Sequence, residues 1–173
     1  MSATTPVIRY AVAADRAPTL AFMRATGFFR PDEIEVAAEV FDEALKAGPA
    51  GHYQSFAAVA DAAPVGWVCI GPTPCTLGTF DLYWIAVAPA SQGRGVGSLL
   101  LRHAEALIHA RHGRLVVIET SGQARYDATR FFYLKNGYAE AARLPDFYAP
   151  GDDKVVYLKA LNGGASPLFK SCA

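Results

Sequence analysis

Hydrophobic and polar positions change their period several times along the chain, and each change predicts a new element. Short apolar runs bounded by turn residues predict strands, and apolar residues repeated every three or four positions predict helices. The predicted strands span residues 7–12, 53–60, 65–70, 80–87, 115–118, 138–144 and 154–161. The predicted helices run from Asp15 to about Thr26, from Pro31 to before Gly48, from Val96 to before Gly113, and from Tyr126 to Asn136.

Residues with strong preferences for helix ends support these boundaries. Asp15 can cap the first helix and Gly27 can end it. Pro31 suits the first turn of the second helix, and Gly137 follows the last helix, where a C-terminal cap favours glycine. The residues 150–153, Pro-Gly-Asp-Asp, predict the turn between the final two strands.

The predicted order of elements is βααβββαβαββ, which indicates an α/β (α+β) fold with helices flanking a mixed sheet. The apolar run at 115–118 has no polar alternation, which is typical of a strand buried inside such a sheet. No internal repeat or linker divides the chain. We therefore expect a single domain over residues 1–161 and a loose C-terminal tail over residues 162–173.

Composition and charge argue against several other classes of protein. Hydrophobic residues make up 52% of the 173 positions and charged residues 18%, as in a globular domain. The 16 basic and 16 acidic residues cancel, so the basic surface needed to bind nucleic acid is not predicted. The longest uncharged apolar stretch, residues 82–90, is far short of a membrane span, and no signal peptide is visible. We expect a soluble cytoplasmic protein that binds neither nucleic acid nor membrane.

The spacing of cysteines and histidines predicts neither a disulfide framework nor a metal site. Cys69, Cys75 and Cys172 are too few and too scattered for either. No two of the four histidines show metal-ligand spacing with an acid. His103 lies on the apolar stripe of the third helix, so we expect a buried histidine whose hydrogen bonds are satisfied.

A glycine-rich loop between an apolar strand and a helix is the main functional feature. It consists of residues 92–97, Gln-Gly-Arg-Gly-Val-Gly. Alternating glycines let the backbone approach a ligand, and the following helix directs free amides and the positive end of its dipole there, so the loop suits a phosphate. A nucleoside-triphosphate loop ends in Gly-Lys-Ser/Thr, but Gly97 is followed by Ser98 and Leu99. A dinucleotide loop needs its third glycine one residue later.

With the strand before it, this loop resembles motif A of the GNAT superfamily of N-acetyltransferases, in which Gln-x-x-Gly-x-Gly follows a strand ending in Ile-Ala-Val. The apolar run at 82–87 resembles the fourth strand of that superfamily. The segment 131–138, Phe-Phe-Tyr-Leu-Lys-Asn-Gly-Tyr, resembles its motif B. The resemblance extends over about residues 7–160. It implies a mostly antiparallel sheet in which the fourth and fifth strands form a parallel pair.

The resemblance also implies acetyl-CoA as co-substrate and an amine as acceptor, with direct acetyl transfer in a ternary complex. Ile85, Ala86 and Val87 are expected to meet the pantetheine arm through their backbone, and an amide near Val87 to hold the oxyanion. The other residues expected around CoA are Gln92, Gly93, Arg94, Gly95, Val96, Gly97, Ser98 and Asn136.

Amide formation requires a base for the amine and an acid for the departing thiolate. The resemblance makes Tyr133, four residues before Gly137, the expected acid. Asp81 lies four residues before Ile85, where histone-type relatives carry a glutamate base. Aspartate is a methylene shorter, so a bridging water is expected there. Glu119, at the end of the next strand, is the rival base, and water alone is the third option.

The acceptor stays open between a small-molecule amine, a peptide N-terminus and a lysine. The resemblance assigns its recognition to the first two helices and the final hairpin, where acids and aromatics could hold a cationic amine. These residues are Phe22, Phe28, Phe29, Arg30, Glu33, Glu35, Asp146, Phe147, Tyr148, Asp152 and Asp153. A non-catalytic acyl-CoA-binding module of the same fold is the alternative function, and a homodimer is a further open question.

Overall fold

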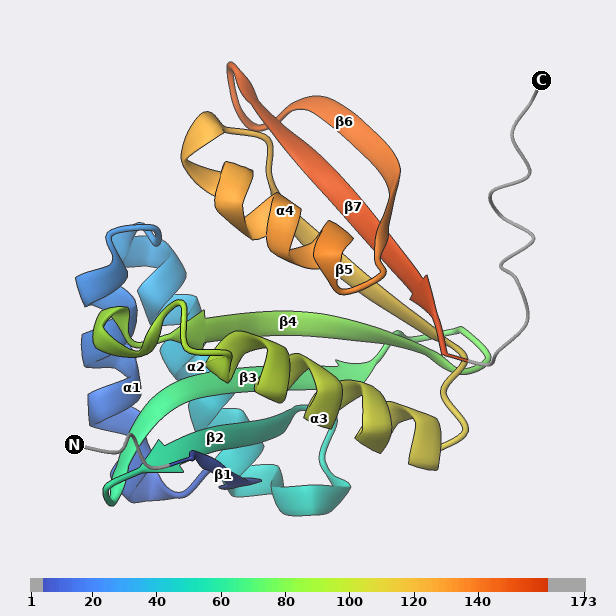
Figure 1. Ribbon diagram of the computed structural model, residues 1–173. Coiled ribbons are helices and arrows are strands. Elements are labelled where there is room, and N and C mark those ends of the chain that lie inside the picture. Colours follow the sequence, from blue (N-terminus) through green and yellow to red (C-terminus); the bar gives the residue numbers. More distant parts are fainter. Residues whose placement is uncertain (1–4, 162–173) are drawn as a thin grey trace. The chain divides into compact units, whose positions relative to one another are not determined.

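The computed structural model describes residues 5–161, and its elements follow the predicted order (Figure 1). The strands are β1 Val7–Tyr10, β2 Gln54–Ala60, β3 Ala63–Pro72, β4 Thr79–Val87, β5 Leu115–Ser121, β6 Ala139–Ala149 and β7 Asp152–Ala160. The helices are α1 Ala13–Thr26, α2 Pro31–Ala47, α3 Val96–Ala110 and α4 Asp127–Lys135. Short 3-10 turns are η1 Gly48–Ala50, η2 Pro89–Ser91 and η3 Ala124–Tyr126. The predicted tail at 162–173 lies outside the described residues.

The strands form one mixed sheet in the order β1-β2-β3-β4-β5-β7-β6, with β4 and β5 as the parallel pair. The pairs β1–β2, β2–β3, β5–β7 and β6–β7 are antiparallel. The predicted fold class is therefore confirmed. The chain divides into two compact units. The first holds the residues up to Pro72 together with Asp81–Ala106, and the second holds Thr73–Phe80 with the residues from Leu107 onward.

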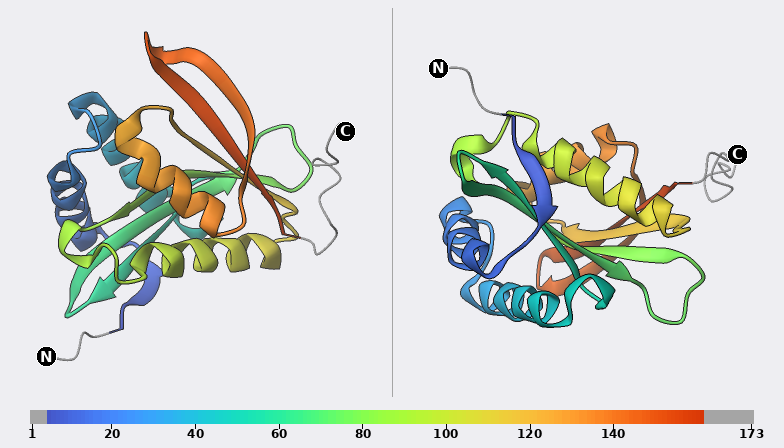
Figure 2. Two further views of the ribbon diagram at one scale, coloured as in Figure 1. Left: turned by 45° about the horizontal axis from the view of Figure 1, so that its top comes forward. Right: turned by 90° about the horizontal axis from the view of Figure 1, so that it is seen from below.

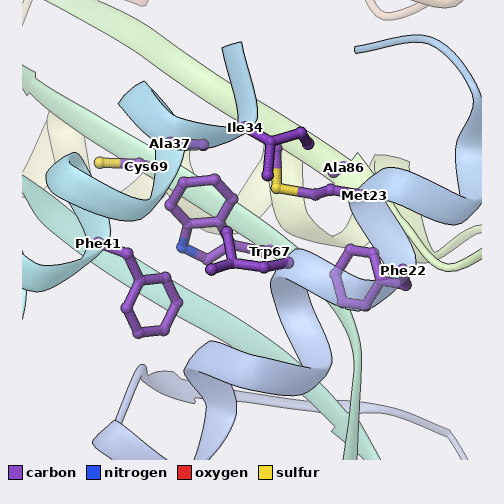
Figure 3. Packing of buried hydrophobic residues seen from close by; sticks show 9 residues of the cluster. Phe22, Met23, Ile34, Ala37, Phe41, Trp67, Cys69 and Ala86 are labelled. Carbon is purple, nitrogen blue, oxygen red and sulfur yellow. The ribbon is translucent and has the colours of Figure 1, made fainter. Parts of the chain in front are cut away.

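In the first unit, α1 and α2 cover one face of the strands and the start of α3 covers the other (Figure 2). Trp67 of β3 faces α1 and α2, in a buried cluster with Met23 and Phe41 (Figure 3). Its neighbour Gly66 faces α3, since a Cβ there would lie 2.9 Å from Leu100 Cδ1. Helices on both faces explain why β3 is apolar along most of its length.

Trp67 also positions β4 within this unit. Its ring centroid lies 5.5 Å from that of Phe41 and 6.2 Å from that of Trp84 on β4. The buried indole Nε1 donates to Ser55 Oγ at 2.7 Å, so its polar atom is satisfied without water. The aromatic cluster therefore holds the last residues of β4 against α1 and α2.

In the second unit, β7 lies between β5 and β6. An aromatic side chain on the buried face of α4 packs against β7. The register sets Ile118 of β5 opposite Tyr157 of β7. The ring of Tyr133 on α4 lies 5.7 Å from that of Tyr157 and 6.1 Å from that of Tyr138. Strand β6 forms the edge of the sheet and is exposed along almost its entire length.

Helix ends agree with the prediction except at the start of α1. The N-cap is Val12, whose N–H donates to Asp15 Oδ2 at 2.9 Å. The prediction of Asp15 as the capping residue itself was wrong, because Asp15 lies inside the first turn and bonds back to the cap. Gly27 and Gly137 have φ of +70° and +83°, which confirms glycine as the terminator of α1 and α4. No helix within residues 5–161 has the length and apolar character needed to span a membrane.

The turn before the last strand is shorter than predicted. β6 extends to Ala149 and β7 begins at Asp152, so only Pro150 and Gly151 lie between them. Gly151 has φ of +79°, which a tight turn accepts most readily from glycine. Asp152 thereby becomes a strand residue rather than a turn residue.

Candidate active site

The loop between β4 and α3 has a backbone conformation that glycine adopts most readily. After β4 ends at Val87, η2 and four turn residues lead into α3. Gly93 and Gly95 have φ of +72° and +83°, in the left-handed region. A Cβ added at either position would meet no atom within 4 Å. The backbone angles therefore favour glycine at both positions, and the space beside them is open.

The first turn of α3 presents amides that have no partner within the helix. Leu99 N–H donates to Gly95 O at 2.9 Å and begins the helical ladder. The ladder does not include the amides of Val96, Gly97 and Ser98, so the helix itself provides no acceptor for them. Together with the positive end of the helix dipole, they favour an anion. The loop before them is exposed, so it is accessible to such a ligand.

Two side chains attach this loop to the first unit. Gln92 Nε2 donates to Val87 O at 3.2 Å, which closes the loop onto the end of β4. Val96 is buried, and a Cβ at Gly66 would lie 3.0 Å from its Cγ1. Both side chains therefore contact the protein itself, and only the backbone of these two residues is left to contact a ligand. Arg94 is exposed at the rim of the loop.

The regular alternation of β4 is interrupted in the middle of the strand. Adjacent Tyr83 and Trp84 both pack against the core cluster under α1 and α2, whereas neighbours in a regular strand face opposite sides. Tyr83 Oη lies 3.5 Å from Asp81 Oδ2, so these two side chains lie on the same face of the strand. Because the alternation is interrupted, the face shared by Asp81 and Tyr83 cannot be extended to Ile85 by counting every second residue. Ala86 is buried in the cluster, so only its backbone is available to a ligand.

A histidine that the sequence did not mark as functional joins this pair. His52 Nε2 lies 2.9 Å from Tyr83 Oη, and the Tyr53 ring packs edge-on against both rings. Desolvation raises the pKa of the Tyr83 phenol, and the charge of Asp81 raises it further, so the hydroxyl keeps its proton. His52 and Tyr83 are 31 residues apart. No sequence motif connects them, which is why the contact was missed.

Tyr133, the expected acid, is buried in the second unit at 4% exposure. The rings of Phe132, Tyr138 and Tyr157 lie 5.5, 6.1 and 5.7 Å from its own. Desolvation is the main reason that the pKa of its phenol is raised above the ordinary value. Tyr133 therefore carries its proton at neutral pH, as a general acid must.

Glu119, the rival base, is engaged in an ion pair within the second unit. Its carboxylate lies 2.5 Å from Lys154 Nζ, and that ammonium lies 4.4 Å from the centre of the Phe147 ring. Phe147 in turn packs edge-on against Tyr148 with 5.1 Å between ring centroids. A substrate amine or a water would have to compete with Lys154 for the Glu119 oxygens.

The acids of the final hairpin bind the protein itself. Asp152, predicted to face the acceptor, is 4% exposed and accepts hydrogen bonds from Ser121 Oγ at 2.5 Å and Gln123 Nε2 at 2.9 Å. It ties the start of β7 to the end of β5. Asp153 Oδ1 accepts from the Asp146 N–H at 3.1 Å. Asp152 is therefore a buried, hydrogen-bonded acid that is not free to attract an acceptor amine.

Most residues expected to recognise the acceptor from α1 and α2 are likewise engaged locally. Phe22 is buried in the core cluster, so its side chain is not available to an acceptor. Phe29 packs edge-on against Trp84 with 5.7 Å between centroids. Glu33 Oε2 accepts from the Arg30 N–H at 2.8 Å, which caps the start of α2.

Two further predicted residues have environments that the sequence did not specify. The half-buried ring of His103 packs against Phe56 at 4.8 Å, and its Nε2 has no partner among the described residues, so the predicted satisfied histidine is wrong. Desolvation lowers the pKa of His103. Asn136 Nδ2 donates to Phe132 O at 2.8 Å. Within residues 5–161, no cluster of three His, Cys, Asp or Glu side chains is suited to a metal ion.

Comparisons with known proteins agree with this fold and loop. A family model for the acetyltransferase (GNAT) domain matches residues 51–140, which include the loop and α4. The crystal structure of a Desulfovibrio desulfuricans protein assigned as a GNAT-family acetyltransferase is 41% identical, with a TM-score of 0.86. The match covers 90% of this chain and 99% of that chain. No curated protein matches significantly in sequence.

More distant structures share the fold alone. An aminoglycoside 6'-N-acetyltransferase in complex with coenzyme A is 18% identical, with a TM-score of 0.75 over 92% of this chain and 99% of that one. A Salmonella typhimurium protein assigned as an acetyltransferase, with acetyl-CoA bound, is 18% identical, with a TM-score of 0.72 over 95% and 98%. The fold and the loop thus define an acetyltransferase. The chain belongs to the GNAT family.

Proposed function

We propose that the protein transfers an acetyl group from acetyl-CoA to a primary amine, which attacks the thioester directly in a ternary complex. The observation that carries this proposal is the loop at Gly93 and Gly95, whose open, left-handed backbone leads into the free amides of α3. Relatives of the same fold bind coenzyme A or acetyl-CoA, which supports the choice of ligand. The acceptor is a small-molecule amine, a peptide N-terminus or a lysine.

In the proposed complex, CoA is held mainly by backbone groups. The pyrophosphate accepts hydrogen bonds from the loop and helix amides, and Arg94 and the Ser98 hydroxyl add a charge and a donor. The backbone of Ile85, Ala86 and Val87 meets the pantetheine arm. Gln92 and Val96 keep the loop in place through the contacts described above. Asn136 lies at the adenosine end.

The proposed chemistry moves one acetyl group and two protons. The amine loses a proton to Asp81 through a bridging water, its nitrogen attacks the thioester carbonyl, and an amide near Val87 stabilises the oxyanion. The C–S bond then breaks, the thiolate takes a proton from Tyr133, and the Tyr133 phenolate takes the second proton that the attacking nitrogen gives up as it becomes an amide. Burial raises the pKa of the Tyr133 phenol, so it holds its proton until the thiolate forms. The ion pair with Lys154 makes Glu119 the weaker candidate base.

We place the reaction in the cytoplasm. Cys69 and Cys75 are free thiols, the first buried and the second exposed. An exposed free thiol persists more readily in a reducing compartment.

The test is release of free CoA thiol, followed with a thiol reagent across a panel of small amines, peptides with free N-termini and lysine peptides. We expect acceptor-dependent release together with the acetylated product by mass spectrometry. Tight CoA binding without release above hydrolysis for any acceptor would instead support the alternative, a non-catalytic acyl-CoA-binding module.

A further inference from the structure

A chain of polar side chains runs from the middle of β4 to the protein surface. Asp81 and Tyr83 are half-buried, and the exposed residue His52 precedes β2. Tyr83 Oη lies 3.5 Å from Asp81 Oδ2 on one side and 2.9 Å from His52 Nε2 on the other. The phenol hydroxyl therefore lies between the carboxylate and the solvent-facing imidazole.

Gly71 of β3 makes this arrangement feasible. A Cβ at Gly71 would lie 2.6 Å from His52 O, 3.0 Å from Tyr83 Cε2 and 3.3 Å from His52 Nε2. Any larger residue would push the His52 segment away from the Tyr83 ring. The ring of Tyr53 packs against both from another side, with centroids 4.8 Å from His52 and 5.1 Å from Tyr83. The contact is thus enforced by packing on several sides.

Tyr83 has one hydroxyl proton and two neighbours that can accept it. The shorter contact is to His52 Nε2, which favours donation to the imidazole and leaves the phenol oxygen able to accept from Asp81. The titratable groups that face the phenol are Asp81 on β4, Tyr53 and His52 before β2, and Cys69 on β3. Because the phenol does not ionise in these surroundings, it can pass a proton only by receiving one as it gives one.

We infer that Tyr83 and His52 form a proton relay. After Asp81 has taken a proton from the acceptor amine, the relay carries that proton from Asp81 to solvent. The inference rests on the proposed function, with Asp81 as the base. In the relay step, the Asp81 O–H proton passes to Tyr83 Oη while the Tyr83 hydroxyl proton passes to His52 Nε2. The products are the Asp81 carboxylate, an intact phenol and a His52 imidazolium, which then loses its proton to water.

The chemistry of the three side chains gives the relay its direction. A carboxylate is a weak base and an imidazole a stronger one, since model side chains titrate at about 3.9 and about 6.5. Transfer from a carboxylic acid to an imidazole is therefore favourable, and the reverse reaction, return of the proton to the product, is suppressed. The exposure of His52 then allows exchange with bulk water. Tyr83 and His52 act through Asp81 and do not touch the reacting atoms.

The kinetic test compares Tyr83→Phe, His52→Gln and the double variant, with Tyr53→Phe as matched control. Tyr83→Phe removes the linking hydroxyl and keeps the ring, and His52→Gln keeps hydrogen-bonding capacity but cannot carry the proton. We expect each single variant to lower kcat about fivefold or more, with unchanged CoA affinity. The double variant should be no slower than the slower single variant, because the two residues act as a unit. Tyr53→Phe should retain the wild-type rate.

Chemical rescue separates a relay from a structural role. The variant His52→Ala opens space at an exposed position, so added imidazole should restore much of its activity. Imidazole should not rescue Tyr83→Phe, because the hydroxyl link is missing. Rescue of both variants, or of neither, would contradict a relay through Tyr83.

A readout on the free protein is independent of turnover. If Tyr83 donates to Nε2, the neutral His52 ring carries its proton on Nδ1, which is the minor tautomer of a free histidine side chain. Long-range ¹H–¹⁵N NMR should show this tautomer in wild type and in Tyr53→Phe, and a return to the Nε2–H form in Tyr83→Phe. The Nε2–H form in wild type would overturn the relay.

These outcomes distinguish the relay from the proposed function. Wild-type acetyl transfer with unaltered rates in Tyr83→Phe and His52→Gln would overturn the relay and leave the acetyltransferase function intact. Absence of acetyl transfer by wild type with every acceptor would overturn both.

Discussion

The carboxylate of Glu119 lies 2.5 Å from Lys154 Nζ, with side-chain exposures of 47% and 16%. This ion pair engages Glu119, which was a candidate base on sequence grounds. Its partner is further held over the ring of Phe147. Lys154 therefore competes with any substrate amine or water for this carboxylate of β5, and Asp81 on β4 becomes the first base to test.

Replacing the two candidate bases should separate their roles. Glu119→Gln should leave kcat within about twofold of wild type, whereas Asp81→Asn should lower kcat by at least about tenfold, the usual scale of general-base catalysis. Steady-state thiol release with one acceptor, at saturating acetyl-CoA, measures both. A large loss in Glu119→Gln with none in Asp81→Asn would reverse the assignment.

The glycine loop can be tested by adding bulk and negative charge where the phosphate should bind. Gly95→Asp should abolish CoA binding, measured by isothermal titration calorimetry. Gly151→Asp is the matched control, because Gly151 has a similar φ of +79° and the same open space beside it, but lies in the β6–β7 turn. The control should bind CoA normally. Retained binding by Gly95→Asp would show that the pyrophosphate lies elsewhere.

Tyr133→Phe removes the proposed acid while keeping the packed ring. We expect kcat to fall at least about tenfold, which corresponds to about 1.4 kcal/mol in the barrier, with CoA affinity preserved. Tyr157→Phe is the control, since its ring lies 5.7 Å from that of Tyr133 and shares its packing. It should turn over at the wild-type rate. Equal kcat for wild type and Tyr133→Phe would remove this hydroxyl from the mechanism.

Asp152 should matter for stability rather than for acceptor binding. Asp152→Ala leaves Ser121 Oγ and Gln123 Nε2 without their acceptor in a buried environment, and should reduce the free energy of unfolding by about 2 kcal/mol. Asp153→Ala removes a more exposed carboxylate and should cost less than about 1 kcal/mol. Urea denaturation measures both. Equal stabilities would contradict a structural role for the Asp152 network.

The ion pair at the start of α1 predicts a pH dependence of stability. Burial of Asp15 opposes its ionisation, but hydrogen bonds from Arg9 and the Val12 N–H outweigh this, so its pKa is lowered. A lowered pKa stabilises the folded state at pH values above the unfolded-state pKa of about 3.9. This stabilisation is lost as the pH falls through the folded-state pKa.

Asp15→Asn tests this directly. The variant should be less stable than wild type at pH 7, and the difference should shrink as the pH falls below about 4. Asp42→Asn is the control, because Asp42 forms a largely exposed pair with Arg16 and should show a smaller difference. A constant stability gap between wild type and Asp15→Asn across the pH range would show that ionisation of Asp15 is not its source.

Local sequence signals predicted the elements well because each depends on nearby residues. The period of apolar residues located every helix, and glycines with positive φ ended α1 and α4 as expected. The errors also have local causes. Asp15 could satisfy the cap from inside the helix, and the short Pro150–Gly151 turn left Asp152 to begin a strand.

By itself, the sequence determined the order of elements and the glycine loop before α3, since short-range periodicity and backbone preferences encode both. Only the tertiary structure decided which polar side chains meet. The contacts of His52 with Tyr83, of Glu119 with Lys154 and of Ser121 with Asp152 join residues 31 or more apart. Strand pairing and packing create such contacts, and their partners share no local pattern through which a sequence could show them.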